Sequence, residues 1–168
     1  MRPFRSVLYI PASMERALDK ARELPADAII FDLEDAVAPD EKARARVLLG
    51  QVLSAAAYAP RYRIVRVNGA ATAWGAEDIA AFADHAGVDA ILLPKVDGPG
   101  DLAAPGQKPL WAMMETPLAM LNAGAIAAHP RLQGMVMGTN DLAKDMGLRA
   151  RADRMPLMTG LGLCLIAA

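Results

Sequence analysis

Short apolar runs alternate with longer helical segments along almost the whole chain, and this alternation is the feature that most constrains the fold. Six runs predict strands, at Ser6–Pro11, Ala28–Leu33, Arg63–Asn68, Ala90–Lys95, Pro109–Glu115 and Leu132–Gly138. Helical spacing of apolar residues predicts helices at Met14–Leu24, Pro39–Ala57, Ala76–His85, Pro117–Ala128 and from about Pro156 to the end. A regular alternation of this kind is typical of α/β proteins with a buried parallel sheet.

The segments between these elements carry three further expectations. Ser13 stands just before the first helix and is expected to cap it. The Gly/Pro-rich stretch that follows Lys95 has room for only a short helix, and a polar loop is expected after Gly138.

Two architectures agree with this alternation, an open doubly wound sheet and a (β/α)8 TIM barrel. No G-x-G-x-x-G follows any of the six runs, so the nucleotide-binding form of the open sheet lacks its signature. A complete barrel takes about 250 residues, whereas this chain has 168. We therefore predict one domain over residues 1–168, an α/β (β/α)8 barrel with about six of its eight βα units and apparently truncated at the C-terminus.

The charge and cysteine content exclude several classes of protein. The chain has 18 Lys and Arg residues and 19 Asp and Glu residues, so no net positive charge attracts nucleic acid over a long range. The single cysteine, Cys164, excludes a disulfide framework and a Cys-rich zinc site, and it is expected in the core. The longest apolar stretch, Leu157–Ala168, is well short of the roughly 20 residues of a membrane helix. A cytoplasmic protein without nucleic-acid or membrane partners is expected.

Polar side chains stand at the end of nearly every predicted strand. They are Asp32, Glu34, Asp35, Arg66, Asn68, Lys95, Glu115, Asn140 and Asp141. Ligands of parallel α/β folds bind outside the carboxyl ends of the strands, and the chemistry of a barrel takes place there. The sequence therefore predicts a functional site at this edge.

Glu115 and Asp141 end consecutive predicted units, so neighbouring strands roughly 4.8 Å apart would hold them. Two carboxylates at that spacing suit Mg²⁺ or Mn²⁺, although a bare pair could also serve as acid and base. Arg66 would grip a substrate carboxylate or a developing enolate oxygen. Lys95 could form a Schiff base, but the carboxylates favour a metal instead.

Six motifs together resemble one family. They are R-S-x-L-Y-I-P at Arg5–Pro11, D-L-E-D-A-V at Asp32–Val37, R-V-N at Arg66–Asn68, P-K at Pro94–Lys95, M-E-T-P at Met114–Pro117 and G-T-N-D-L at Gly138–Leu142. In order and spacing they are similar to the citrate lyase β-subunit-like proteins of the HpcH/HpaI aldolase superfamily, which includes malyl-CoA and citramalyl-CoA lyases.

The resemblance implies a trimeric or hexameric barrel that cleaves or forms a C–C bond through a Mg²⁺-stabilised enolate. The substrate would be a 3-hydroxy-acyl thioester of the malyl-CoA, citramalyl-CoA or citryl type, with a keto acid such as oxaloacetate as a further ligand. It implies Glu115 and Asp141 as metal ligands, Arg66 as oxyanion clamp, and Glu34 and Asp35 as acids that hold metal waters and Arg66. Gly138 and Thr139 would line the substrate carboxylate pocket, and Arg5 would lie near the strand ends, touching the acyl-carrier phosphate.

Two alternatives stay open from the sequence. One is an aldolase that makes pyruvate and an aldehyde from a free acid, and the other is a catalytically silent subunit that binds metal and a keto acid or serves assembly. The second follows from the early end of the chain, because no residue matches the late aspartate that protonates the enolate in CoA lyases of this kind. An inactive or poorly folding 168-residue chain is therefore one expectation.

Overall fold

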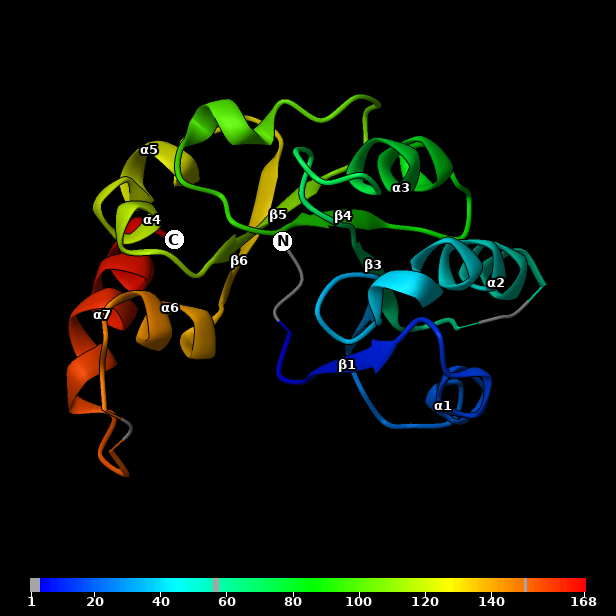
Figure 1. Ribbon diagram of the computed structural model, residues 1–168, viewed down its shortest axis with the longest axis horizontal. Coiled ribbons are helices and arrows are strands. Elements are labelled where there is room, and N and C mark those ends of the chain that lie inside the picture. The colour runs from blue at the N-terminus through cyan, green and yellow to red at the C-terminus, as the bar shows by residue number, and fades with distance from the viewer. Residues whose placement is uncertain (1–3, 56–57, 150) are drawn as a thin grey trace. The chain divides into compact units, whose positions relative to one another are not determined.

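The computed structural model describes residues 4–55, 58–149 and 151–168. Contacts divide these residues into two units, each with its own part of the core. The first unit runs to Leu92 and includes Pro105–Pro109, and the second comprises Leu93–Ala104 and Leu110–Ala168. Figure 1 labels the helices and strands of both.

The first unit is built on parallel strands that follow one another in chain order. They are β1 (Val7–Pro11), β2 (Ala28–Asp32), β3 (Tyr62–Arg66) and β4 (Ala90–Leu93, whose last residue belongs to the second unit). In this register Pro11 pairs with Asp32, and Asp32 pairs with Arg66. The last residues of β2 and β3 therefore lie side by side at the carboxyl ends of the strands.

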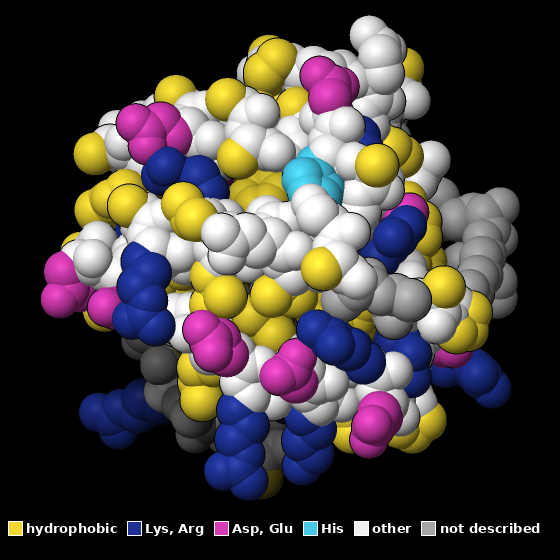
Figure 2. Space-filling view, turned by 90° about the vertical axis from the view of Figure 1, so that its right-hand side faces the viewer, with side chains coloured by type: hydrophobic (Ala, Val, Ile, Leu, Met, Phe, Trp, Pro, Cys, Tyr) yellow, Lys and Arg dark blue, Asp and Glu magenta, His cyan; other side chains and the backbone are white. Residues whose placement is uncertain are grey.

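The helices of the first unit lie along one face of these strands (Figure 1). They are α1 (Glu15–Ala21), the 3-10 turn η1 (Pro39–Glu41), α2 (Lys42–Ala55) and α3 (Gly75–Phe82). Every residue of β2 is buried, as expected for a strand covered on both faces. Tyr58 is part of the core of this unit. Its ring packs edge-on against Phe31 with centroids 5.0 Å apart, and its hydroxyl donates to the Leu18 carbonyl. On the face of the molecule in Figure 2, acidic and basic side chains are interspersed with apolar ones.

The second unit contains the parallel pair β5 (Leu110–Met114) and β6 (Leu132–Met137). A register shift between Leu110 and Trp111 brings Trp111 opposite Gly134. A Cβ at Gly134 would lie 2.6 Å from the Trp111 ring, so this close approach requires glycine. β5 is buried throughout, whereas β6 is mostly half-buried.

Short helices complete the second unit. They are η2 (Pro99–Leu102), α4 (Pro117–Leu121), α5 (Ala123–Ala127), α6 (Thr139–Asp145), η3 (Met155–Leu157) and α7 (Met158–Ala167). Helix α7 packs on α4 and α5. Its Cys164 is buried with its sulfur 3.7 Å from that of Met120, which confirms the expectation of a core cysteine.

All six predicted strands and the predicted helices are present, and the short helix after Lys95 is η2. Three local predictions are wrong. The segment Pro117–Ala128 forms two helices because the chain turns out of helical geometry at Asn122, whose side-chain amide donates to the Asp97 carbonyl. The expected loop after Gly138 is helix α6. Helix α1 begins without a side-chain cap, so Ser13 does not cap it. The predicted end of the second helix at Ala57 lies outside the described residues.

Within the residues that the structure describes, no helix combines the length and apolar character that a membrane crossing requires.

Candidate active site

Glu115 follows β5 directly and is buried, with 2% of its surface exposed. The backbone N–H of Lys95 donates to its Oε1 over 2.8 Å. Lys95 adopts a left-handed conformation with φ 51°, which residues other than glycine rarely do. Pro94 and Val96 on either side are buried. The backbone of Lys95, whose N–H donates to Glu115, is therefore held in an unusual conformation between two buried neighbours.

The side chain of Lys95 joins Glu115 to Asp141, the third residue of α6. Its Nζ is ion-paired with Asp141 Oδ2 and lies 3.8 Å from Glu115 Oε1. The Asp141 side chain is 31% exposed and that of Lys95 45%, so this group opens to solvent on one side. The structure thus brings the two predicted metal ligands to a single cation, here an ammonium group.

Gly138 sits against Glu115 at the end of β6. Its N–H donates to the Met114 carbonyl over 3.0 Å, which continues the pairing of β5 and β6. A Cβ at this position would lie 2.5 Å from the Glu115 Cβ and 2.6 Å from its Oε2. Only glycine fits there, so the first residue of the G-T-N-D-L motif is needed to seat the Glu115 carboxylate.

The donor chemistry of Glu115 and Asp141, hereafter the carboxylate pair, suits a hard divalent ion. Within the described ranges no group of three or more His, Cys, Asp or Glu side chains is arranged to hold a metal. Mg²⁺ is commonly bound by one or two carboxylates, with water and substrate oxygens in its other positions. The Lys95 ammonium already shows that a cation fits beside both groups. The residues present therefore fit Mg²⁺ or Mn²⁺.

Asp97 is a residue of this unit that the sequence analysis missed. It accepts a hydrogen bond from the hydroxyl of Thr116, which also caps α4 by accepting from the Ala119 N–H. The Asn122 amide donates to its backbone carbonyl. These bonds fix the loop after Lys95 to the segment after Glu115. Asp97 lies in a Gly/Pro-rich stretch with no motif around it, so the sequence carries no signal for it.

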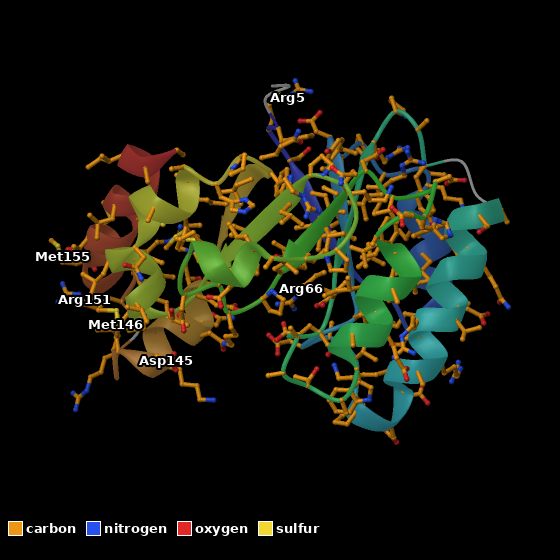
Figure 3. All side chains as sticks on the ribbon, turned by 90° about the horizontal axis from the view of Figure 1, so that it is seen from above. Arg5, Arg66, Asp145, Met146, Arg151 and Met155 are labelled. Carbon is orange, nitrogen blue, oxygen red and sulfur yellow. The ribbon has the colours of Figure 1, made fainter. Side chains whose placement is uncertain are left out.

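Thr139 and Asn140 line a cavity of about 130 Å³ in the second unit. Arg149, Arg151 and Arg154 also line it, and Arg151 is labelled in Figure 3. Thr139, on the same helix as Asp141, thus lies beside a cavity lined by basic side chains.

In the first unit, Arg66 ends β3 and is buried among acids. Its Nε and Nη2 donate to the two carboxylate oxygens of Asp32, and its Nη1 lies 2.7 Å from Glu34 Oε2 and 3.4 Å from Asp35 Oδ2. Burial alone would lower the pKa of Arg66, but the hydrogen bonds and negative charge of Asp32, together with Glu34, raise it above its ordinary value. Arg66 is therefore a permanent cation held in one orientation.

The expectation that Glu34 and Asp35 hold Arg66 agrees with these contacts, but the two-point partner is Asp32. Asp32 also accepts the N–H groups of Glu34 and Ala36, so it orders the loop that follows β2. The signal available in the sequence was the position of Asp32 as the one charged residue within the apolar run Ala28–Leu33. A carboxylate there is buried by its own strand and needs a buried cation opposite.

Two further polar side chains support this loop: Lys42, which was not predicted, and Asn68, which was predicted among the polar residues at the strand ends. The Lys42 ammonium donates to the carbonyls of Leu33 and Glu34, and burial lowers its pKa despite the charge of Glu34. The Asn68 amide donates to Leu33 and to the fully buried Asp78, which Arg46 also contacts. The residues after β2 and β3 are therefore fixed by buried polar bonds.

The predicted place of Arg5 near the carboxyl ends of the strands is wrong. Arg5 bonds Asp27 through its backbone N–H and its guanidinium, and Asp27 directly precedes the first residue of β2. Arg66 pairs with Asp32 at the other end of the same strand. Figure 3 shows Arg5 well away from Arg66. The cause is the register of β1 and β2, which places Val7 beside Ala28 and leaves Arg5 before both strands.

Comparison with known proteins agrees with the motifs. The model of the HpcH/HpaI aldolase/citrate lyase family matches residues 5–161. A (3S)-malyl-CoA thioesterase of Cereibacter sphaeroides is 65% identical over 170 residues, which cover 99% of this chain and 59% of that relative. The citrate lyase subunit beta of Escherichia coli is 34% identical, with 94% of this chain and 56% of the relative covered. The chain thus spans less than two thirds of the length of these relatives.

A solved structure extends the agreement to the fold. The citrate lyase beta subunit of M. tuberculosis, complexed with oxaloacetate and magnesium, has a TM-score of 0.81 and 31% identity, covering 96% of this chain and 72% of that chain. This likeness confirms the predicted α/β fold of TIM-barrel type, with six parallel strands among the described residues. On the family match, the identities and the fold together, the chain belongs to the HpcH/HpaI aldolase/citrate lyase family.

Proposed function

We propose that the protein is an enzyme of CoA-thioester chemistry that hydrolyses a malyl-CoA-type thioester with the help of a divalent metal ion. The observation that carries the proposal is the placement of Glu115 and Asp141 around one cation. The 65% identity to a (3S)-malyl-CoA thioesterase supports the substrate and the reaction. Binding of oxaloacetate and magnesium by the citrate lyase beta subunit of M. tuberculosis supports a keto-acid-like ligand and Mg²⁺, with Mn²⁺ as a second candidate.

The carboxylate pair would hold the metal. The Lys95 N–H fixes one oxygen of Glu115, and Gly138 leaves the space that the other oxygen occupies. Asp141 projects from the first turn of α6 and supplies the second donor. A metal ion bound there would act as a Lewis acid on the carbonyl group of the substrate.

The remaining predicted residues have roles in substrate binding under this proposal. Arg66, held by Asp32, Glu34 and Asp35, would bind a carboxylate or an oxyanion of the substrate as a fixed cation. Glu34 and Asp35 would act as positioning residues for Arg66. Gly138 and Thr139 would line the pocket of the substrate carboxylate, and the backbone N–H of Thr139, at the start of a helix that follows a parallel strand, would approach that carboxylate. The N–H of Gly138 is bonded to the Met114 carbonyl, so Gly138 would contribute the space beside Glu115.

The test is the product of the reaction with (3S)-malyl-CoA and Mg²⁺, separated by chromatography. Thioester hydrolysis gives malate and free CoA, and both should form at the same rate. The Glu115→Gln variant, or EDTA, should reduce that rate at least about 100-fold, because the metal is lost with its ligand. An equal rate in the wild type and in Glu115→Gln would refute the role of the carboxylate pair.

C–C cleavage is the second candidate, favoured by the identity to the citrate lyase subunit beta. Cleavage of malyl-CoA between C2 and C3 gives acetyl-CoA and glyoxylate, so the same chromatogram separates the two reactions. Formation of pyruvate and an aldehyde from a free 4-hydroxy-2-keto acid would instead indicate the aldolase. Metal and oxaloacetate binding without any turnover would indicate the silent binding or assembly subunit.

A further inference from the structure

We propose that the ammonium group of Lys95 is the resident cation of the carboxylate pair, and that a divalent metal ion binds by displacing it. The inference rests on the proposed function, since it concerns the metal site assigned there. It adds a residue that sets the affinity of the site and that pairs with the carboxylates when no metal is present.

The first support is the backbone of Lys95. Its left-handed φ of 51° is a conformation that glycine adopts more readily, yet a lysine stands there. The geometry points its N–H at Glu115 Oε1 while its side chain reaches Asp141. One residue thus contacts both carboxylates, through its main chain and its side chain.

The second support is charge. Glu115 is almost fully buried, and a buried carboxylate requires a nearby cation or hydrogen-bond donors. Lys95 supplies a donor and a single positive charge to two carboxylates, which leaves the pair with a net charge of −1. A divalent ion would neutralise the pair completely, so the pair attracts such an ion even with the ammonium in place.

The third support is freedom of movement. The Lys95 side chain is 45% exposed, and its Nζ touches Asp141 at the solvent side of the group while lying 3.8 Å from Glu115. A four-carbon stem of this kind can turn its ammonium group into water without moving the backbone. The N–H bond to Glu115 would then remain, so displacement frees the cation position and keeps one carboxylate in place.

The experiment titrates Mn²⁺ into wild type, Lys95→Met, Lys95→Arg and Lys144→Met, with free Mn²⁺ followed by its paramagnetic resonance signal. Lys144 lies exposed on α6, the helix of Asp141, and its variant removes the same charge. Lys95→Met should bind Mn²⁺ at least about tenfold more tightly than wild type, whereas Lys144→Met should stay within about twofold because water and salt screen its charge. Lys95→Arg keeps the competing charge and should not gain affinity.

Thermal unfolding gives a readout independent of metal affinity. In EDTA, Lys95→Met should unfold at a lower temperature than wild type, because the pair loses its cation. With saturating Mn²⁺ the difference should shrink or reverse. If Lys95→Met fails to fold, Lys95→Gln, which also lacks the ammonium group, is compared with wild type in the same way.

Three results would overturn the inference. If wild type binds Mn²⁺ in a manner that requires Glu115 and Lys95→Met binds no more tightly, the metal site stands and the displacement by Lys95 is wrong. If Lys95→Met is as stable as wild type in EDTA, Lys95 is not the resident cation. If neither protein binds Mn²⁺, the metal site of the proposed function is wrong as well.

Discussion

Arg66 and Asp32 form a two-point buried ion pair, in which Nε and Nη2 of the guanidinium lie 2.8 and 2.5 Å from the two carboxylate oxygens. The pair joins the last residues of two neighbouring strands. Because Asp32 also accepts two N–H groups of the following loop, the pair fixes both the end of the sheet and the loop that carries Glu34 and Asp35. A planar guanidinium suits this arrangement, and an ammonium group would not replace it.

We expect Asp32→Asn to lower the free energy of unfolding by about 3 kcal/mol, because one partner of a buried pair is lost while the other stays charged. Urea denaturation followed by circular dichroism measures the change. Asp19→Asn is the matched control, since Asp19 pairs with Arg22 on the exposed surface of α1. That variant should lose no more than about 1 kcal/mol. Equal losses in the two variants would contradict a structural role for the Asp32 pair.

Gly138→Ala should lower stability by about 1–3 kcal/mol and weaken Mn²⁺ binding, because the added methyl group overlaps the Glu115 side chain. Gly124→Ala is the control. Gly124 is exposed on α5 with nothing within 4 Å of an added Cβ, so alanine should stabilise the helix by about 0.5–1 kcal/mol. Unchanged Mn²⁺ binding in Gly138→Ala would show that Glu115 has room to move.

Addition of Mg²⁺ should raise the unfolding temperature of the wild type, and removal of Mg²⁺ with EDTA should reverse the rise. At a concentration of 100 times the dissociation constant, binding adds about 2.7 kcal/mol to stability. Asp141→Asn should abolish this increase, whereas Asp145→Asn, on the same helix, should retain it. Differential scanning fluorimetry with and without EDTA measures all three proteins. A retained increase in Asp141→Asn would remove Asp141 from the metal site.

Acid should destabilise the protein partly through Asp27. Hydrogen bonds from Arg5 lower the pKa of Asp27 from 3.8 to about 2 in the folded chain. The stabilisation is therefore fully present above about pH 4 and is lost as the pH falls through about 2. Unfolding temperatures measured from pH 5 down to pH 2 should fall less steeply in Asp27→Asn and in Arg5→Met than in the wild type. Arg16→Met, an exposed change outside the pair, should leave the slope unaltered; the same slope in all four proteins would contradict this origin.

The regular alternation of apolar runs predicted the strands because strands such as β2, β4 and β5 are buried along their whole length and therefore consist almost entirely of apolar residues. The neighbourhood of Glu115 and Asp141 followed from the same logic, since consecutive parallel strands end at one edge. Both carboxylates indeed contact the Lys95 ammonium. Their metal-binding role stays a prediction, as do the roles of Arg66, Thr139 and the single-domain organisation.

The errors arose where single side chains decide the structure. Thr139–Asp145 forms α6 although its composition is polar, because tertiary packing of Leu142 in the core outweighs local preference. Asn122 ends α4 through a bond to a residue 25 positions away, which no local pattern records. Asp32 was recognised as a strand-end acid, but its pairing with Arg66 depends on a register that the sequence leaves open.

Because Cys164 is buried, its reaction with a thiol reagent reports when the structure around it opens. Cys164 is the one cysteine of the sequence, and burial raises the pKa of its thiol, so a thiol reagent reacts with it only after α7 leaves Met120. The labelling rate therefore measures how often the second unit opens locally, without any introduced probe. A ligand that makes local opening of this unit rarer slows the labelling. The labelling kinetics can be followed in protein that carries no mutation.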